Sequence, residues 1–495
     1  VLSIPRKLKS QEVVRHGFMS NFLFQNISNI FGAPGVVKEI VEKLSPARED
    51  PKKRGTENLR HISDISVDGN GNAEVSNEIV IGKAQGLFGE KHYQEIAAEI
   101  EPRLSGLSGS GSISAVEQSI SKLADTVKER IRQEVVAPVM DAYEVKRGTQ
   151  NRVERQVDQE IDLKFDQLRS DYTQQANIAK AELDRRQHAA ETEADVQAAE
   201  KEYASSMENA LRALTEAAQT VVQDTIRNKP TELVAQMEQQ KAEAEKKSIE
   251  DTVRDHLRGF ARTIPSFIMA YGDENLTLRN FDDYTEDDVF EEVTGITEAN
   301  FRFLRDGGEY QDPETGERTF FAGHLFDETV FNDSIAEFWK KKQELADYFD
   351  ETHTEDIFDY IPPQKTNQIF TPRWVVKKMV DALEENNPGC FDDPTKTFAD
   401  LYMKSGLYIT EIVKRLFRSE KMKTLFPDDG TRIRHILRRQ VYGMAPTRII
   451  YLIATNYILG FDPHLKDETT HFVQADAAKA AKDGTLDKLV EKHFG

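Results

Sequence analysis

The sequence predicts a mainly α-helical chain that ends in an α/β domain, and three observations carry this prediction. From residue 113 to 250, Ala, Gln, Glu, Lys and Arg dominate, and apolar residues recur every three or four positions. From residue 361 onward, helix-like and strand-like segments alternate, as in a doubly wound α/β domain. The chain has 495 residues, enough for roughly three domains of ordinary size.

Changes in composition divide the chain into five predicted segments. The Ser/Gly-rich run at 105–112 (SGLSGSGS) follows no strand and precedes no Lys-Ser/Thr pair, so it predicts a flexible linker rather than a phosphate loop. The sequence contains no Walker-type loop, and we expect no ATP hydrolysis from it. The segments are a mixed α/β segment (1–104), the flexible linker (105–112), a helical coiled-coil coupler (113–250), an acidic helical connector (251–360) and the α/β domain (361–495).

The predicted coupler has narrow apolar stripes on long helices, which is typical of an antiparallel coiled-coil arm. Pro138 and Gly148 are expected to interrupt the first helices, and Pro230 is expected to end the last one, because proline lacks a backbone donor and disfavours helix before it. The weakly hydrophobic segment 179–201 predicts a helix that bridges through solvent. A spacer role is favoured over an active site here.

The net charge of −21 is unevenly distributed. Residues 273–360 hold 26 acidic and 7 basic side chains, whereas residues 361–495 hold 17 acidic and 21 basic ones. The basic C-terminal segment is a weak indication of nucleic-acid binding, and an ordinary solvated surface explains it equally well. In the acidic connector, the turns DGG (306–308) and DPETG (312–316) predict short strands, residues 320–348 predict a helix, and no nuclease-like carboxylate spacing occurs.

The single cysteine, Cys390, excludes an internal disulfide framework and a cysteine-based metal site. No apolar run approaches the ~20 residues that a membrane span needs, and no signal peptide is recognisable. We therefore expect a soluble cytoplasmic protein that does not contact a membrane.

The C-terminal segment predicts the order helix (374–384), strand (397–401), helix (409–417), helix (433–439), strand (440–443), helix (448–459) and a third strand that ends at Asp476. In such a domain ligands bind at the carboxyl ends of the strands.

Three groups of residues lie where such a ligand is expected. Thr371 and Pro372, in NQIFTP (367–372), precede a helix as its expected N-cap and first-turn residue. In DLYMKSGLY (400–408), Gly406 lets the backbone approach a ligand, and Asp400 can accept hydrogen bonds from an ammonium or hydroxyl group. Asp476, at the end of HFVQAD (471–476), is placed to bind an amine.

These motifs resemble the amino-group DNA methyltransferases, and specifically the adenine-N6 enzymes that are fused to restriction enzymes. IFTPRWVVKKMV (369–380), FADLYMKSGLYITEIVKRL (398–416), VYGMAPTRIIYLIATNYIL (441–459) and HFVQAD follow the family's order over about 130 residues. The resemblance implies a partial Rossmann-like methyltransferase fold and S-adenosylmethionine as cofactor. The implied cofactor-binding residues are Phe370, Thr371, Pro372, Asp400, Ser405, Gly406 and Asp476.

The sequence departs from the family pattern at several positions. Leu401 replaces the proline after the aspartate, Lys404 replaces the first loop glycine, and Ala445 replaces the acid that binds the ribose. The catalytic (N/D)PP(Y/F) motif is absent, so we expect no catalytic residue in this chain and no metal site. The implied interpretation is a fragment of a longer polypeptide, cut before that motif, with 486–495 as the helix preceding it.

The same resemblance extends to possible partners. Segments 255–272 and 288–303 look similar to the region that joins a helicase motor to the methyltransferase in large single-chain restriction enzymes, which makes residues 1–104 the end of the motor. Implied partners are double-stranded DNA and, in the same polypeptide, upstream helicase or nuclease domains and a downstream target-recognition domain. The arginines of 432–439 are candidates for phosphate contacts, although a solvated helix face is favoured.

Two other interpretations stay open. One is a non-catalytic coupler with a degenerate methyltransferase fold that recognises DNA or partner domains, which Lys404 and Ala445 favour. The other is a coiled-coil scaffold that carries an unrelated α/β domain.

Overall fold

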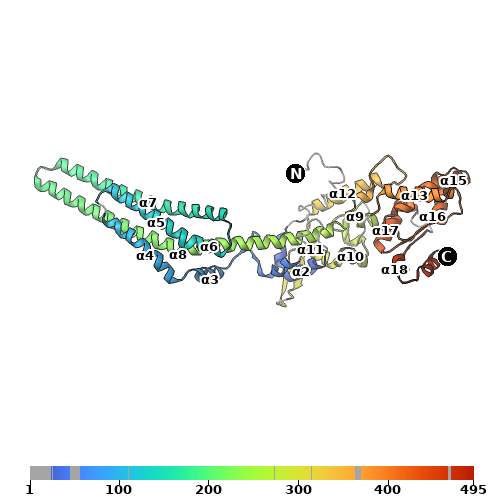
Figure 1. Cartoon of the computed structure of the whole chain (residues 1–495), viewed down its shortest axis with the longest axis horizontal. Coiled ribbons are helices and arrows are strands. Elements are labelled where there is room, and N and C mark those ends of the chain that lie inside the picture. Colours follow the sequence, from blue (N-terminus) through green and yellow to red (C-terminus); the bar gives the residue numbers. More distant parts are fainter. Residues whose placement is uncertain are drawn as a thin grey trace. The chain divides into compact units, whose positions relative to one another are not determined.

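The computed structural model describes residues 24, 26–44, 56–109, 111–272, 274–313, 315–362, 370–465 and 470–495. The chain forms two compact units. One unit combines residues 1–67 with residues 246–495, and the other, here called the helical unit, comprises residues 68–245. Helices dominate both units (Figure 1).

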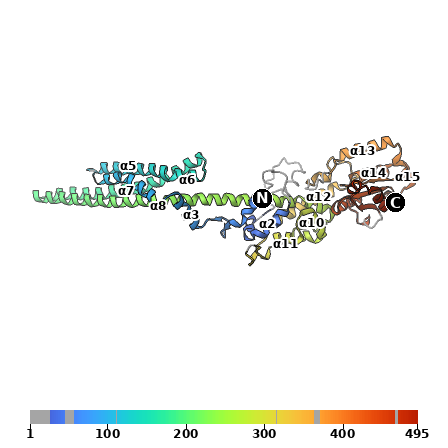
Figure 2. The same cartoon turned by 60° about the horizontal axis from the view of Figure 1, so that its bottom comes forward.

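The helical unit is a bundle of long antiparallel helices (Figures 1 and 2). Lys128 of α5 lies 2.7 Å from Asp162 of α7, and Thr173 of α7 donates a hydrogen bond of 2.8 Å to Glu117 of α5. The residue numbers rise along one helix as they fall along the other, so the two run in opposite directions. The helices are α3 (Asn77–Leu87), α4 (Glu90–Ser105), α5 (Ile113–Ile131), α6 (Ala137–Ala142), α7 (Arg147–Ala189) and α8 (Glu193–Ala261), whose residues 193–245 belong to this unit.

Helices α7 and α8 form a hairpin whose turn lies at residues 190–192. Arg186 pairs with Glu202, and Glu160 pairs with Lys229, which again gives antiparallel order. The predicted single bridging helix over 179–201 is therefore wrong, because this segment contains the turn. Its weak hydrophobicity fits the outer end of a hairpin, where each helix has few neighbours to pack against.

Pro230 lies inside α8, so the prediction that it ends the helix is wrong. Proline costs a helix about 3 kcal/mol through the missing donor and the clash with the preceding turn. The apolar stripe of α8 continues on both sides of it, with Ile226 and Val234 fully buried. Burying this stripe outweighs the local cost, since packing of an apolar face supplies most helix stability in proteins.

The two units differ from the five predicted segments in where the chain divides. The expected linker 105–112 contains a short 3₁₀ helix (Gly106–Gly109) with Leu107 buried, and Ser112 caps α5 by accepting a 3.2 Å hydrogen bond from the Ala115 amide. Residue 110 lies outside the described residues. Helix α4 packs on α5, which is why residues 68–104 belong with the helical unit rather than with residues 1–67.

The first described residues pack on the connector, hundreds of residues away in sequence. Helix α2 (Pro34–Lys43) ends at Leu44, whose carbonyl lies 2.9 Å from Nδ1 of the buried His256. Tyr310 donates a 2.8 Å hydrogen bond to the Gly32 carbonyl. These contacts join residues 26–44 and the connector into one core, to which Leu59 and Ile62 also belong. The other elements of this segment are η2 (Ile27–Gly32), η4 (Glu57–Asp64) and β1 (Ser66–Val67).

The helices of the connector pack around a cluster of phenylalanine rings, which includes Phe260, Phe281 and Phe301. The predicted turns and strands are confirmed, since β3 pairs antiparallel with β4. The helix expected over 320–348 begins only at residue 328, because Phe320 and Phe321 belong to β4. The elements are α9 (Ile264–Ala270), η7 (Phe281–Tyr284), α10 (Asp287–Thr294), α11 (Glu298–Asp306), β3 (Gly308–Gln311), β4 (Arg318–Phe321), α12 (Glu328–Leu345) and η8 (Ile357–Tyr360).

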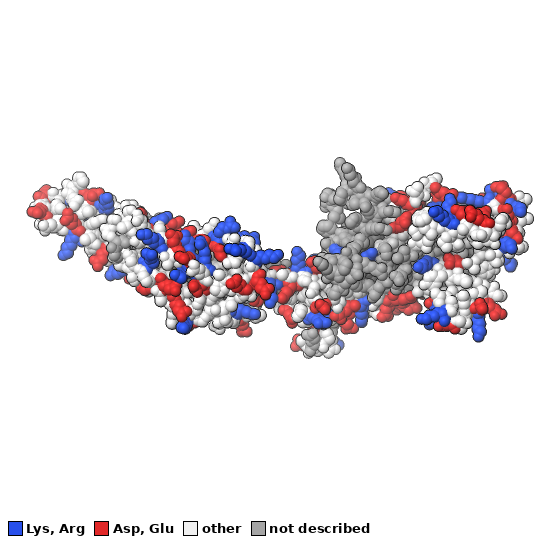
Figure 3. Space-filling view, in the orientation of Figure 1, with Lys and Arg blue, Asp and Glu red and all other residues white. Residues whose placement is uncertain are grey.

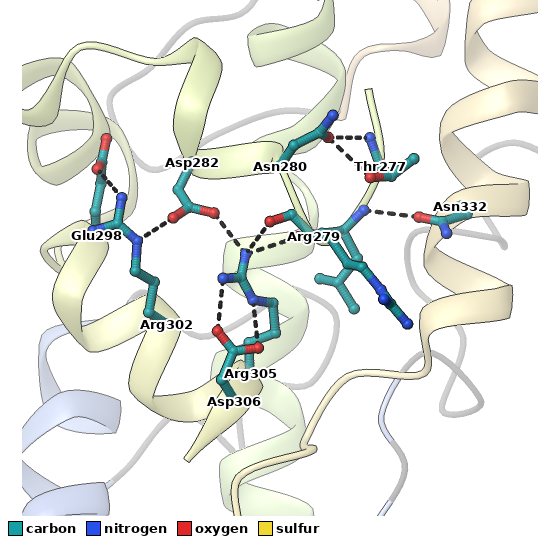
Figure 4. A network of polar contacts seen from close by, with 10 residues as sticks. Thr277, Arg279, Asn280, Asp282, Glu298, Arg302, Arg305, Asp306 and Asn332 are labelled. Carbon is teal, nitrogen blue, oxygen red and sulfur yellow. Dashed lines mark hydrogen bonds and ion pairs between the residues drawn. The ribbon is translucent and has the colours of Figure 1, made fainter. Parts of the chain in front are cut away.

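One carboxylate of the connector is buried and doubly paired (Figure 4). Asp282, which is 3% exposed, binds Arg302 through one oxygen and Arg305 at 2.6 Å through the other. Arg305 also donates to the carbonyls of Leu278 and Arg279, each at 3.0 Å. The two arginines therefore supply the charge and the donors that a buried carboxylate needs.

The C-terminal residues form a three-stranded parallel sheet in the order β5-β6-β7, with helices between successive strands. The predicted alternation is thus confirmed. Helices α14 and α17 contact each other and strand β6. The elements are α13 (Arg373–Asn386), β5 (Phe398–Asp400), α14 (Leu407–Arg418), α15 (Glu420–Leu425), α16 (Asp429–Arg439), β6 (Val441–Ala445), α17 (Arg448–Ile458), β7 (His471–Gln474), α18 (Ala477–Lys482) and α19 (Leu486–Phe494).

Candidate cofactor-binding site

The loop after β5 folds back over the neighbouring strand. The Met403 amide donates a 2.8 Å hydrogen bond to the Met444 carbonyl of β6, and the Met403 side chain is fully buried. At the end of the loop, the Leu407 amide donates to the Ser405 hydroxyl at 3.3 Å. The chain then enters α14 through Gly406, so this loop is anchored at both ends.

A cavity of about 340 Å³ lies beside this loop and the first half of α13. It brings together Thr371, Asp400, Ser405 and Gly406, four of the residues that the sequence predicted. The remaining lining residues are Val376, Met379, Ala399, Leu401, Tyr402, Lys404, Leu407 and Tyr408. The predicted motifs thus converge on one cavity at the carboxyl end of a parallel strand, where ligands bind in open α/β sheets.

Asp400 is the carboxylate of this cavity, and it has no cationic partner among the described residues. It is partly buried, and its only recorded hydrogen bond comes from the Tyr402 amide at 3.0 Å. Burial raises the pKa of Asp400, and the Tyr402 amide opposes this only in part. An ionised Asp400 therefore carries a charge that the fold does not neutralise, and a cationic group in the cavity would.

Lys404 lines the same cavity with the opposite charge. Its ammonium lies 5.8 Å from the centre of the Tyr402 ring, and it forms no ion pair with any described residue. The first turn of α14 also lines the cavity, and its N-cap, Gly406, supplies no side-chain hydrogen bond to it. The amides at this end of α14 favour an anion nearby.

The role of Gly406 differs from the predicted one. Its φ of 81° lies in the left-handed region, and a Cβ atom there would meet Ile458 Cγ1 at 3.0 Å and the Ala454 carbonyl at 3.1 Å. The missing side chain therefore makes room for α17 and not for a ligand. Gly406 nevertheless contributes backbone to the cavity wall.

The TP motif contributes to the site unevenly. Thr371 lines the cavity, but the N-cap of α13 is Pro372, so the predicted cap at Thr371 is wrong. The helix starts at Arg373, directly after Pro372, whose extended ψ of 142° keeps it outside the helix. Phe370 packs 4.8 Å from the Phe358 ring and is not among the cavity-lining residues. Residues 367–369 of the motif lie outside the described residues.

Asp476 lies apart from this cavity. Strand β7 ends at Gln474 and not at Asp476 as predicted, and Asp476 caps α18 by accepting a 2.9 Å hydrogen bond from the Lys479 amide. Because the strands are parallel, Asp476 follows the same edge of the sheet as Asp400, two strands away, but the register places Asp400 level with Phe472, four residues before Asp476. Between them, the side chain of Ala445 at the end of β6 is fully buried.

The sequence did not predict the aromatic side of the cavity. Tyr402 is 47% exposed at its wall, and Tyr408 is half-buried in the first turn of α14. Burial and the nearby Asp400 raise the pKa of Tyr408. Both tyrosines belong to the loop motif DLYMKSGLY (400–408). Two aromatic residues in a polar loop were the sequence feature from which this side of the cavity could have been predicted.

A second cavity, of about 680 Å³, lies between α9, α12 and α17. Its Lys342 is buried, with the ammonium 4.4 Å from the Trp339 ring centre and 4.1 Å from that of Phe461. Asn456 donates to the Ala270 carbonyl at 2.8 Å, and Tyr348 donates to the Ile458 carbonyl at 3.0 Å. These polar side chains are engaged within the fold, so the larger cavity is the weaker candidate site.

The predicted basic run of α16 is partly internal. Arg432 is buried, donates a 2.8 Å hydrogen bond to the Phe426 carbonyl and lies 4.1 Å from the centre of the Phe417 ring. It is therefore not placed to contact a phosphate. On the face drawn in Figure 3, basic and acidic side chains of the C-terminal region are interspersed.

Among the described residues, no helix combines the length and the apolar composition that a membrane crossing requires. The same residues form no group of three or more His, Cys, Asp or Glu side chains suited to a metal ion. No protein-family model, no curated protein and no solved structure matches the chain.

Proposed function

We propose that residues 361–495 are the cofactor-binding half of an S-adenosylmethionine-dependent DNA adenine-N6 methyltransferase with a Rossmann-like fold. The observation that carries this proposal is the convergence of Thr371 with Asp400, Ser405 and Gly406 on one cavity at the end of β5. These residues come from two motifs that are about 30 positions apart in the sequence. Their order matches the family pattern, and their meeting at a strand end matches where such a cofactor binds.

The residues present suit the methionine end of this cofactor. Asp400, whose charge no described cation neutralises, would accept hydrogen bonds from the α-ammonium group. The first turn of α14 would face the α-carboxylate. Asp476, farther along the same edge, would bind the adenine amine. S-adenosylmethionine supplies the methyl group when bound. The transfer step itself belongs to the (N/D)PP(Y/F) motif, which this sequence does not contain.

The wider proposal is that the chain is part of a cytoplasmic restriction–modification protein. Its substrate would be double-stranded DNA, with an adenine extruded from the helix for methylation. The helical unit would couple the methyltransferase to helicase or nuclease domains of the same polypeptide, and a further domain would recognise the target sequence. The mildly basic balance of residues 361–495 supports DNA as the partner.

The direct test is isothermal titration of S-adenosylmethionine into the full chain and into its Asp400→Asn variant. We expect binding by the unsubstituted chain and a loss of roughly 10- to 100-fold in the variant, since hydrogen bonds to charged groups contribute about 1.5–3 kcal/mol. Asp283→Asn, at an exposed carboxylate of the connector, is the matched control and should bind normally. A folded chain that does not bind the cofactor contradicts the proposal.

The second candidate function is a non-catalytic coupler with a degenerate methyltransferase fold. Two observations favour it, namely the lysine in the cavity wall and the apolar, buried Ala445 at the end of β6. A folded chain that binds double-stranded DNA but not S-adenosylmethionine would favour the coupler.

A further inference from the structure

The cavity beside β5 contains one group of each charge, Asp400 and Lys404, and both are half-buried. Asp400 ends a strand and is partly buried. Lys404 lies over the exposed ring of Tyr402 in the cavity wall. The two charged groups are not paired with each other. A ligand that satisfies both must itself carry an ammonium group and an anionic group.

The anionic end of such a ligand has a second set of donors. Helix α14 has 12 residues and starts at the cavity, and its N-cap, Gly406, provides no side-chain acceptor for its first turn. The Ser405 hydroxyl is already the acceptor for the Leu407 amide, so it does not compete for the following amides of the turn. An α-carboxylate between these amides and Lys404 would receive donors from both sides.

We propose that Lys404 is a specificity residue that recognises the α-carboxylate of the amino-acid part of the ligand, so that the cavity selects a zwitterion. This inference rests on the proposed function and extends it, because it assigns a binding contact to Lys404, which replaces the first loop glycine of the family pattern. The Tyr402 ring restrains the Lys404 side chain at the cavity wall through a cation–π contact. The cavity then distinguishes S-adenosylmethionine from its decarboxylated form, which keeps the ammonium and sulfonium groups.

The test compares these two ligands on matched variants by isothermal titration. The unsubstituted chain should bind S-adenosylmethionine about tenfold more tightly than decarboxylated S-adenosylmethionine. Lys404→Met should lose about tenfold in affinity for the first ligand and little for the second, and Lys404→Arg should keep most of the preference. Lys378→Met is the matched control, because Lys378 also lies over an exposed ring, that of Trp374 at 5.2 Å, but outside the cavity.

The outcomes separate this inference from the proposed function. If S-adenosylmethionine binds the chain but Lys404→Met binds both ligands as tightly as the unsubstituted chain, Lys404 does not recognise the carboxylate. Equal losses for both ligands in Lys404→Met would likewise overturn the inference and leave the cofactor assignment intact. If the chain binds neither ligand, both proposals fail. Thermal melting of each variant checks that it is folded.

Discussion

Two aspartates of the same unit differ in the partners that the surrounding residues provide for their negative charge. Asp282, in the connector, is buried and held by two arginines (Figure 4). Asp400, at the end of β5, is partly buried and receives one backbone hydrogen bond. The first arrangement compensates a charge within the fold, and the second leaves a charge for something else to compensate. The comparison shows that two carboxylates of one unit can differ in their cationic partners, and we expect the unpaired one to be the better candidate for a binding role.

The two cavities described above differ in the same way. The larger one contains a buried lysine, but that lysine lies between two aromatic rings and donates to the Ile268 carbonyl at 3.5 Å. The smaller one contains Asp400 and Lys404, which have no ion-pair partner among the described residues. Volume alone would favour the cavity whose lysine already has partners within the fold.

Breaking the paired carboxylate should have the largest effect. Asp282→Asn should lower the free energy of unfolding by about 3 kcal/mol, because it leaves Arg302 and Arg305 without their shared anion. Urea unfolding followed by circular dichroism measures the loss. The neighbouring Asp283 is exposed, so Asp283→Asn is the control and should change little. Similar unfolding of both variants would refute the structural role of Asp282.

Glu298 adds a third carboxyl group to the comparison. It lies beside the network around Asp282, but the nearby Arg302 does not fully compensate its negative charge. Burial, and the neighbouring Asp287, raise the pKa of Glu298 to about 7, although Arg302 lies 3.0 Å from one of its oxygens. A carboxyl whose pKa is higher in the folded than in the unfolded chain stabilises the fold at low pH. That stability is lost as the pH rises from about 4.5 toward 7.

Glu298→Gln should remove this pH dependence. The melting temperature of the unsubstituted chain should fall relative to that of the variant between pH 5 and pH 8, because its free energy of unfolding decreases by at most about 1.4 kcal/mol per pH unit. Differential scanning calorimetry across this range measures it. Parallel curves for the two proteins would show that Glu298 is ionised in the folded chain throughout.

At the unpaired carboxylate Asp400, replacement by Asn should change the stability of the fold in the opposite direction from Asp282→Asn. Because burial raises the pKa of Asp400, its ionised form destabilises the folded chain at neutral pH. Asp400→Asn should therefore raise the melting temperature slightly at pH 7, while weakening cofactor binding, and the gain should disappear at acidic pH. A melting temperature that falls as in Asp282→Asn would place Asp400 among the structural carboxylates.

The smallest effect is expected in the larger cavity. Lys342→Met should leave the affinity for S-adenosylmethionine unchanged within twofold, because Lys342 belongs to a different set of elements from the cavity beside β5. A large loss of affinity in a folded Lys342→Met variant would mean that the two cavities are not independent.

Sequence patterns predicted the elements whose periodicity is strong. The alternating helices and strands after residue 370 and the β3–β4 turns were confirmed. Pro230 was misjudged because its effect depends on the apolar packing on both sides of it. The association of residues 24–67 with the connector escaped prediction, because contacts such as Leu44 with His256 join residues far apart in sequence.

The candidate site was predicted in part. Thr371, Asp400, Ser405 and Gly406 meet as expected, because strand ends and the loops after them are fixed by the sheet. The space around Gly406 and the position of Asp476 were not predictable from spacing alone. Gly406 packs against α17, which lies about 50 residues later in the sequence. The position of Asp476 depends on the residue at which β7 ends.

The contacts between distant parts of the chain also set an order for folding. Many contacts of the helical unit join helices that are close in sequence, such as Lys128 with Asp162 and Thr173 with Glu117, and the loops between them close at a modest entropic cost. The other unit must join Ser28 to Glu250 and Leu44 to His256 across more than 200 intervening residues. We therefore expect the helical unit to protect its amides from exchange first during refolding, and the N-terminal residues to dock last. During synthesis, residues 24–44 leave the ribosome long before the residues that they contact, such as Glu250 and His256.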